Sequence, residues 1–241
     1  MLTVVLGISA HWSDMTPDVQ DDVAQYRMES QVCVYVMHFH TSKGLLRSNR
    51  LRSELDSQGI PYNTVSSGLV DAKNWPVKCL RSYGYAGNWM SLWKVWTRAT
   101  RSCKAEWVII FESDAAIPPN FLQTFSKARA KNISAKAIWM DERSGFKHSP
   151  HGCCTVATAW HRSTWSQMIA DLDPNGISAW HQNYSHRPNN SGCATHDRPC
   201  LTDFYLCNVV MGRRIPALSF GVVKHPKSNH TDMNWAGAKL G

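Results

Sequence analysis

The sequence lacks the features that would place it in several common classes of protein. Its 241 residues contain no apolar run of about 18 residues, so we expect no membrane-spanning helix. No repeat of roughly 20–50 residues is present, which argues against solenoids and propellers. Charged residues make up only 18% and apolar residues 43%, a balance typical of a globular chain. The length suits one large α/β domain, or a domain with a modest appendage.

A dense basic stripe is also absent, although the net charge is +8 from 26 Lys and Arg against 18 Asp and Glu. The most basic stretch, residues 43–52, holds four positive charges and is followed by no nucleic-acid-binding module. A basic protein attracts phosphates and other anions. We therefore expect a small phosphorylated ligand and no nucleic acid partner.

The eight cysteines follow no regular spacing, and no Cys-x-x-Cys pair occurs. This usage favours reduced, buried thiols and a cytoplasmic protein, including one peripheral to a membrane. Four Asn-x-Ser/Thr sequons keep the lumen of the secretory pathway open as the alternative; they begin at Asn132, Asn183, Asn189 and Asn229. In an oxidising compartment, Cys193 and Cys200 could form a disulfide.

Strand and helix patterns alternate along the chain. Strands are expected at 32–39, 60–66, 106–111, 135–140, 153–160 and 218–223, and helices at 45–58, 88–101, 120–130, 162–172 and 201–212. The first helix begins after a loop at 41–44, and Asn88 is a candidate cap of the second. A strand-helix-strand order favours a parallel sheet with helices on its faces. We assign residues 1–31 to an extension, 32–225 to the domain, and 226–241 to a tail.

Two carboxylates, Glu112 and Asp114, follow the most apolar strand of the chain. In open α/β sheets, ligands bind at the carboxyl ends of the strands. Alternation along an extended segment points residues 112 and 114 the same way. Such a pair suits Mg²⁺ or Mn²⁺, which bind a few carboxylates together with phosphate oxygens. Acidic pairs at strand ends are also often merely solvated, so the pair alone is a weak signal.

The surroundings of this pair resemble glycosyltransferase family 25, which includes lipopolysaccharide-type and collagen-type sugar transferases. The resemblance rests on residues 84–96 (GYAGNWMSLWKVW) and 106–115 (EWVIIFESDA). The family has a Gly-x-x-Gly segment, a Ser-His helix ending in Trp, and a hydrophobic strand running into Glu-Asp-Asp. Weaker matches over roughly 32–225 include the strand VYVMHF, residues 153–162, and the segment TDFYL at 202–206.

The resemblance implies a GT-A-like (Rossmann-like) fold with a mixed, mainly parallel sheet and helices on both faces. It implies a hexosyltransferase that moves a sugar from a nucleotide-sugar donor, most simply a UDP-sugar, to a hydroxyl of a glycan, lipopolysaccharide-like or protein-linked acceptor. It also implies inversion and a divalent ion, Mn²⁺ or Mg²⁺, on Glu112 and Asp114. Ser113 replaces the family's middle Asp and becomes a candidate cofactor contact, and Leu92 replaces its His. These two departures leave open a catalytically inactive module that binds glycan or nucleotide.

An inverting transferase needs a base for the acceptor hydroxyl. Asp203 is the first candidate, although it could merely cap a helix. Asp141 and Glu142, at the end of the next strand, are the alternative bases, and Asp141 could instead contact donor or acceptor hydroxyls. His225, just after the last strand, is a candidate third metal ligand.

Other residues have both a binding and a structural interpretation. Lys43, Arg47 and Arg50 could contact the diphosphate, or form a solvated helix face. The long polar loop at 173–200 could cover the acceptor, and its His and Cys spacing is a poor match to zinc sites. Trp160 could stack on a sugar ring or pack in the core.

Overall fold

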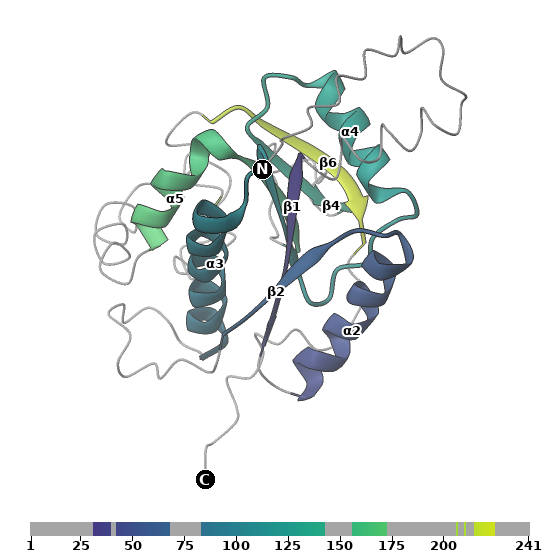
Figure 1. The fold of residues 1–241 in the computed structure, drawn as a ribbon, viewed down its shortest axis with the longest axis vertical. Coiled ribbons are helices and arrows are strands. Elements are labelled where there is room, and N and C mark those ends of the chain that lie inside the picture. Colours follow the sequence, from purple (N-terminus) through teal and green to yellow (C-terminus); the bar gives the residue numbers. More distant parts are fainter. Residues whose placement is uncertain are drawn as a thin grey trace, which may run out of the picture.

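The computed structural model describes residues 31–39, 42–67, 83–142, 156–172, 206, 210 and 215–224. These residues form one sheet with helices on both of its faces (Figure 1). The predicted helix at 201–212 lies outside the described residues apart from Leu206 and Val210, and both of these are buried. Within the described residues, no helix is long and apolar enough to cross a membrane.

The sheet has six strands in the order β2-β1-β3-β5-β4-β6. The strands are β1 (Val32–Phe39), β2 (Tyr62–Ser67), β3 (Trp107–Glu112), β4 (Ala137–Asp141), β5 (Ala157–His161) and β6 (Ala217–Val223). Strands β1, β2 and β3 pair in parallel, as do β4 and β6, whereas β5 is antiparallel to both β3 and β4. Five strands therefore share one direction, which confirms the mixed, mainly parallel sheet.

Helices cover both faces of this sheet. The helices are α2 (Ser42–Ser57), α3 (Tyr83–Ser102), α4 (Phe121–Lys131) and α5 (Trp165–Leu172), the last preceded by a 3-10 turn, η3 (Arg162–Thr164). Side chains of α2 and α4 pack with one set of strand residues, and those of α3 and α5 pack with the other set. The division follows from strand geometry, because successive side chains of a strand point to opposite faces.

Strand β3 shows this division most clearly. Val108 and Ile110 face the cluster under α3, while Ile109 and Phe111 face the cluster under α2 and α4. All four side chains are at most 1% exposed. A strand buried on both faces must be apolar throughout, and this explains why the run WVIIF carries no polar residue before Glu112.

Several predicted boundaries differ from the structure. Helix α3 begins at Tyr83, so Asn88 lies inside the helix and does not cap it. Lys43 belongs to the first turn of α2 and not to a loop. Strand β5 begins at Ala157, four residues later than expected. Glycines near residues 44 and 87 suggested that the two helices begin later than they do. Packing of the helices against the sheet outweighs this local preference.

The cysteines provide a second correction. Cys33 and Cys103, which we expected as free thiols, form a disulfide that joins β1 to the residue after α3. Arg162 also contacts this region, because its guanidinium donates hydrogen bonds to the carbonyl oxygens of Cys103 and Ala105. Together these links fix the end of the sheet at which the parallel strands begin, which we call the amino edge.

Candidate functional site

The predicted site lies at the opposite end of the sheet, where the parallel strands finish, which we call the carboxyl edge. Glu112 ends β3 and Asp141 ends β4, with β5 between the two strands. The backbone N–H of Glu112 donates to the carbonyl oxygen of Val156, at 2.9 Å, just before β5. Two strand spacings of about 4.8 Å therefore separate the ends of β3 and β4.

The acidic pair occupies a turn and not an extended segment. The N–H of Ala115 donates to the carbonyl oxygen of Glu112 at 3.1 Å, which closes the turn. Burial nevertheless alternates as expected: Glu112 and Asp114 are partly exposed, and Ser113 between them is buried. Both acidic residues are therefore partly accessible at the carboxyl edge, although Oδ1 of Asp114 is itself buried, whereas Ser113 belongs to the interior.

Asn88 positions the first carboxylate. Its side-chain amide donates a hydrogen bond to Oε1 of Glu112, at 3.4 Å, from the second turn of α3. Asn88 is only 6% exposed, so its amide has little access to water and depends on a partner within the protein. This role was not predicted from the sequence. A polar residue within an otherwise apolar helix face was the available signal, because buried polar groups require partners.

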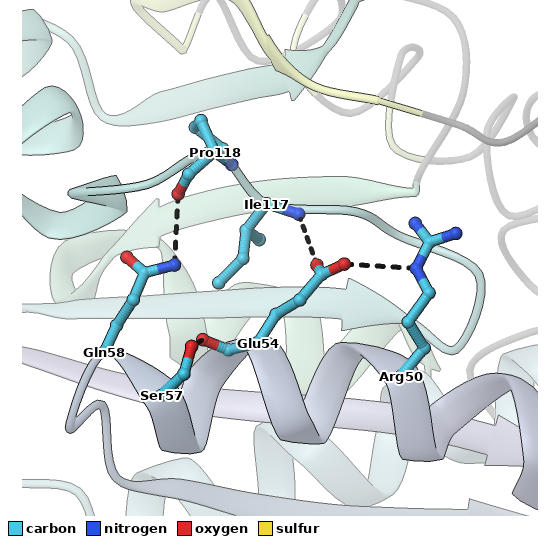
Figure 2. A network of polar contacts seen from close by, with 6 residues as sticks. All are labelled: Arg50, Glu54, Ser57, Gln58, Ile117 and Pro118. Atoms are coloured by element: carbon cyan, nitrogen blue, oxygen red, sulfur yellow. Dashed lines mark hydrogen bonds and ion pairs between the residues drawn. The ribbon is translucent and has the colours of Figure 1, made fainter.

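Helix α2 holds the segment that follows the acidic turn (Figure 2). One carboxylate oxygen of Glu54 accepts the backbone N–H of Ile117 at 2.9 Å. Gln58, one turn later, donates to the carbonyl oxygen of Pro118 at 3.1 Å and accepts the N–H of Phe121 at 2.9 Å. Asn120 precedes α4 with φ 55° and makes no side-chain cap, so Gln58 satisfies the first N–H of that helix instead.

The same segment is held from its other side by the chain that leaves β6. Ala116 and Lys224 exchange two backbone hydrogen bonds, each of 2.9 Å. Lys224 directly precedes His225, and Ala116 lies two residues after Asp114. The fold thus brings the end of β6 to the acidic turn. In the sheet itself, β6 and β3 are not neighbours, because β5 and β4 lie between them. No sequence pattern indicated this contact.

The basic candidates divide between two environments. Arg50 donates from Nε to Oε1 of Glu54 at 3.1 Å, with half of its side chain exposed (Figure 2). Arg47 is half-buried one turn earlier, and the side chain of Lys43 lies outside the description. Because α2 follows the carboxyl end of β1, its first turn lies at the same edge as the acidic turn.

Asp141 is fully buried at the end of β4. The pairing of β4 with β6 is irregular here, since Trp139 pairs with Ser219 and Asp141 with Val223. Gly221 lies in the bulge, and a Cβ atom at this position would come within 2.9 Å of the Cα of Glu142. The absence of a side chain at Gly221 therefore lets β6 approach the end of β4 closely.

Two other candidate positions are structural. Trp160 is fully buried, donates from Nε1 to the Thr158 hydroxyl at 3.0 Å, and packs against Trp96 and Trp139. It therefore belongs to the core and not to a sugar-binding surface. Leu92, at the position of the family's His, is also buried in the cluster under α3. Asp203, His225 and the loop at 173–200 lie outside the described residues.

The donor set suits a hard divalent ion only in combination with other ligands. Among the described residues, no group of three His, Cys, Asp or Glu side chains could hold a metal. Glu112 and Asp114 supply two carboxylates from partly exposed residues of the turn. Mg²⁺ and Mn²⁺ commonly use one or two carboxylates together with phosphate oxygens of a substrate, so the residues present fit such an ion.

At the level of sequence, no protein-family model and no curated protein matches this chain. Among solved structures, it resembles a glycosyltransferase involved in the glycosylation of the major capsid of PBCV-1, with a TM-score of 0.50 and 10% identity over 83% of this chain and 97% of that chain. Mouse xyloside xylosyltransferase 1 gives a TM-score of 0.45 with 8% identity, over 83% of this chain and 99% of that one. A nucleotide-diphospho-sugar transferase of Desulfovibrio desulfuricans gives 0.40 with 12% identity, over 79% of each chain.

The fold assignment rests on the first of these structures together with the sheet topology. The chain has a GT-A-like α/β fold, as the sequence predicted. None of the three structures identifies family 25, which stays a prediction. At 10% identity the likeness shows the fold, and the activity has to be argued from the residues of the carboxyl edge.

Proposed function

We propose that this chain is a glycosyltransferase that moves a sugar from a nucleoside-diphosphate-sugar donor to a hydroxyl acceptor. The observation that carries the proposal is the acidic turn Glu112–Asp114 at the carboxyl edge of a GT-A-like sheet. Asn88, Glu54 and Gln58 hold this turn and the segment after it in a defined position. Preorganised charged groups at the end of a buried strand are what diphosphate chemistry requires.

In this proposal, Glu112 and Asp114 hold Mn²⁺ or Mg²⁺, and His225 completes the set from the chain after β6. The pairing of Ala116 with Lys224 supports the inclusion of His225, because it brings the neighbouring residue to the acidic turn. A bound divalent ion would neutralise charge on the donor diphosphate as the sugar bond breaks.

The protein's own residues complete the site. In this proposal Lys43 and Arg47 contact the donor phosphates, which is supported by their position in the first turns of α2, directly after the carboxyl end of β1. Asp203 accepts the proton of the acceptor hydroxyl, which gives inversion if it does so on the face opposite the diphosphate. Full burial of Asp141 favours a positioning role over direct proton transfer.

The test is the release of nucleoside diphosphate from a panel of nucleotide sugars, with Mn²⁺ and with water or simple sugars as acceptors. One donor should be consumed by the wild-type chain, and Asp114→Asn should lower that rate by about 10²–10³-fold, since several kcal/mol of charge stabilisation are lost. An unchanged rate in Asp114→Asn would refute the proposal. The melting temperature of the variant serves as the control for folding.

A second candidate function, the inactive binding module, is favoured by one observation. Leu92 fills the core where the resemblance places a His, so any role of that His is absent here. This alternative predicts that a nucleotide sugar raises the melting temperature while no nucleoside diphosphate is released from any donor. The same panel therefore separates the two functions.

A further inference from the structure

The first sequon of the chain lies on the amino edge, away from the proposed site. Residues 132–134 directly follow α4, which runs back from the carboxyl edge, and they precede β4. Asn132 and Ser134 are both exposed, and Ile133 between them is 91% exposed. The whole acceptor tripeptide therefore projects into solvent, as an N-glycosylation site must.

The amide of Asn132 is held in a way that leaves room for a sugar. Its Nδ2 donates a hydrogen bond to the carbonyl oxygen of Ala128 at 3.3 Å, and its backbone N–H donates to the carbonyl oxygen of Arg129 at 3.0 Å. A side-chain amide nitrogen carries two hydrogens. Replacement of one by a sugar carbon leaves the other for Ala128, so the end of α4 keeps its cap.

The disulfide is an independent observation that points to the same cellular environment. Cys33 and Cys103 are bonded, and Cys103 is only 6% exposed. Disulfides of this kind form and persist in oxidising compartments such as the lumen of the secretory pathway. That lumen is also where sequons are glycosylated, so the two features support one another.

We propose that Asn132 is an N-glycan acceptor and that the chain matures in an oxidising lumen with Cys33 and Cys103 paired. In the modification, Nδ2 of Asn132 bonds to C1 of an oligosaccharide carried on a lipid diphosphate. The bond from C1 to the phosphate oxygen breaks, the amide loses one proton, and the lipid diphosphate leaves. The two thiols lose two protons and two electrons to a disulfide-bearing oxidant by exchange.

This proposal does not depend on the proposed function. The sequon and the acidic turn lie at opposite edges of the sheet, so a glycan at Asn132 leaves the carboxyl edge open. Glycosylation should therefore leave nucleotide binding unchanged, whatever the activity of the carboxyl edge proves to be.

The experiment uses the full chain isolated from the cells that naturally make it. The chain is unfolded in the presence of an alkylating reagent, so that buried free thiols also react, and N-glycans are released enzymatically in H₂¹⁸O, which converts an occupied Asn to ¹⁸O-labelled Asp. Peptide mass spectrometry should find labelled Asp at position 132 and a cross-linked Cys33–Cys103 peptide. Unlabelled Asn132 would overturn the acceptor assignment, including the case in which Asn183, Asn189 or Asn229 is occupied. Alkylated Cys33 and Cys103 would overturn the compartment.

Matched variants separate glycosylation from folding. Ser134→Ala destroys the sequon without touching the Asn132 hydrogen bonds, whereas Ser134→Thr preserves it. In a secreted expression system, Ser134→Ala should lose one glycan-sized shift in electrophoretic mobility, and Ser134→Thr should keep it. Equal mobility of the two variants would also overturn the assignment.

Discussion

The two edges of the sheet use similar residues for different purposes. On the amino edge, Arg162 donates to backbone carbonyls of residues 103 and 105, and its guanidinium lies 5.0 Å from the ring centre of Trp165. Arg129 lies 5.3 Å from the ring centre of Trp107 and pairs loosely with Glu106, at 3.9 Å. The two guanidinium groups are therefore bound by carbonyl oxygens and aromatic rings of the protein. Burial lowers the pKa of Arg129.

On the carboxyl edge, the acidic turn carries two carboxylates, and the neighbouring polar groups fix the backbone around them. Asn88 reaches Glu112, while Glu54 and Gln58 reach backbone atoms of the segment after the turn. The role of a charged residue therefore depends on whether its neighbours neutralise it or hold it in place at the surface. On the amino edge, charged side chains link parts of the fold to one another. On the carboxyl edge, hydrogen bonds hold charged side chains in a defined position.

The largest effect we expect comes from the amino edge. The double change Cys33→Ser with Cys103→Ser opens a link across a sequence separation of 70 residues. Chain entropy predicts a loss of about 4 kcal/mol in the free energy of unfolding. Urea denaturation of the oxidised chain and of the double variant measures it. Nucleotide binding should survive in the folded variant, and its loss there would break the division between the edges.

A pair of glycines tests both edges with one kind of substitution. Gly221→Ala forces a Cβ against Glu142 at the carboxyl edge and should cost about 1–3 kcal/mol and weaken nucleotide binding. Gly59→Ala, after α2 on the amino edge, meets no atom within 4 Å but has φ +64°. It should cost about 1 kcal/mol and leave binding intact. Thermal melts measure the stability of both variants, and binding titrations measure their affinity for the nucleotide. An equal loss of binding in the two variants would contradict the assignment of nucleotide binding to the carboxyl edge.

The link from α2 to the acidic segment should have a smaller effect. Glu54→Ala removes the acceptors of the Ile117 N–H and of Arg50 Nε, whereas Glu54→Gln keeps one acceptor oxygen for Ile117 and loses only the exposed pair with Arg50. We expect Ala to cost about 1–2 kcal/mol and to weaken nucleotide binding several-fold, with Gln close to wild type. Calorimetric titration measures the affinity. If Gln were as poor as Ala, the charge of Glu54 and not its hydrogen bond would matter.

The smallest effect concerns His161 on the amino edge. Burial lowers its pKa, and the nearby charge of Lys136 lowers it further. Its Nδ1 accepts the N–H of Ser163 at 3.2 Å, which requires the neutral ring. A lowered pKa in the folded state gives stability that is present above the unfolded value of about 6.5 and is lost as the pH falls. His161→Gln should flatten this dependence below about pH 6.5, as urea titrations at a series of pH values would show. An unchanged slope would contradict this assignment.

The sequence predicted the parts of this molecule that depend on local pattern. The bounds 32–39 of β1 are confirmed, and β3 is shifted by one residue, because apolar runs that end in polar residues define buried strands. The placement of Glu112 and Asp114 at the carboxyl edge followed directly. The alternation of strands and helices predicted a parallel sheet with helices on its faces, and the resemblance to family 25 added the expectation of a GT-A-like fold.

The rest depends on contacts between residues far apart in the chain. Glu54 and Ile117 are 63 residues apart, and Ala116 meets Lys224 only because the chain after β6 returns to the acidic turn. Local patterns carry no information about such pairs. The disulfide was missed for the same reason, since irregular spacing gives no indication of which cysteines meet.

The most direct test uses two glutamates at opposite ends of one strand. Glu106 directly precedes β3 on the amino edge, and Glu112 ends it on the carboxyl edge. Calorimetry should measure UDP binding with and without Mn²⁺ for the wild type, Glu112→Gln and Glu106→Gln, with further nucleoside diphosphates if UDP proves silent. We predict Mn²⁺-dependent binding that Glu112→Gln abolishes and Glu106→Gln leaves unchanged. Binding that persists in Glu112→Gln, or that Glu106→Gln weakens equally, would contradict the assignment of the carboxyl edge as the functional site.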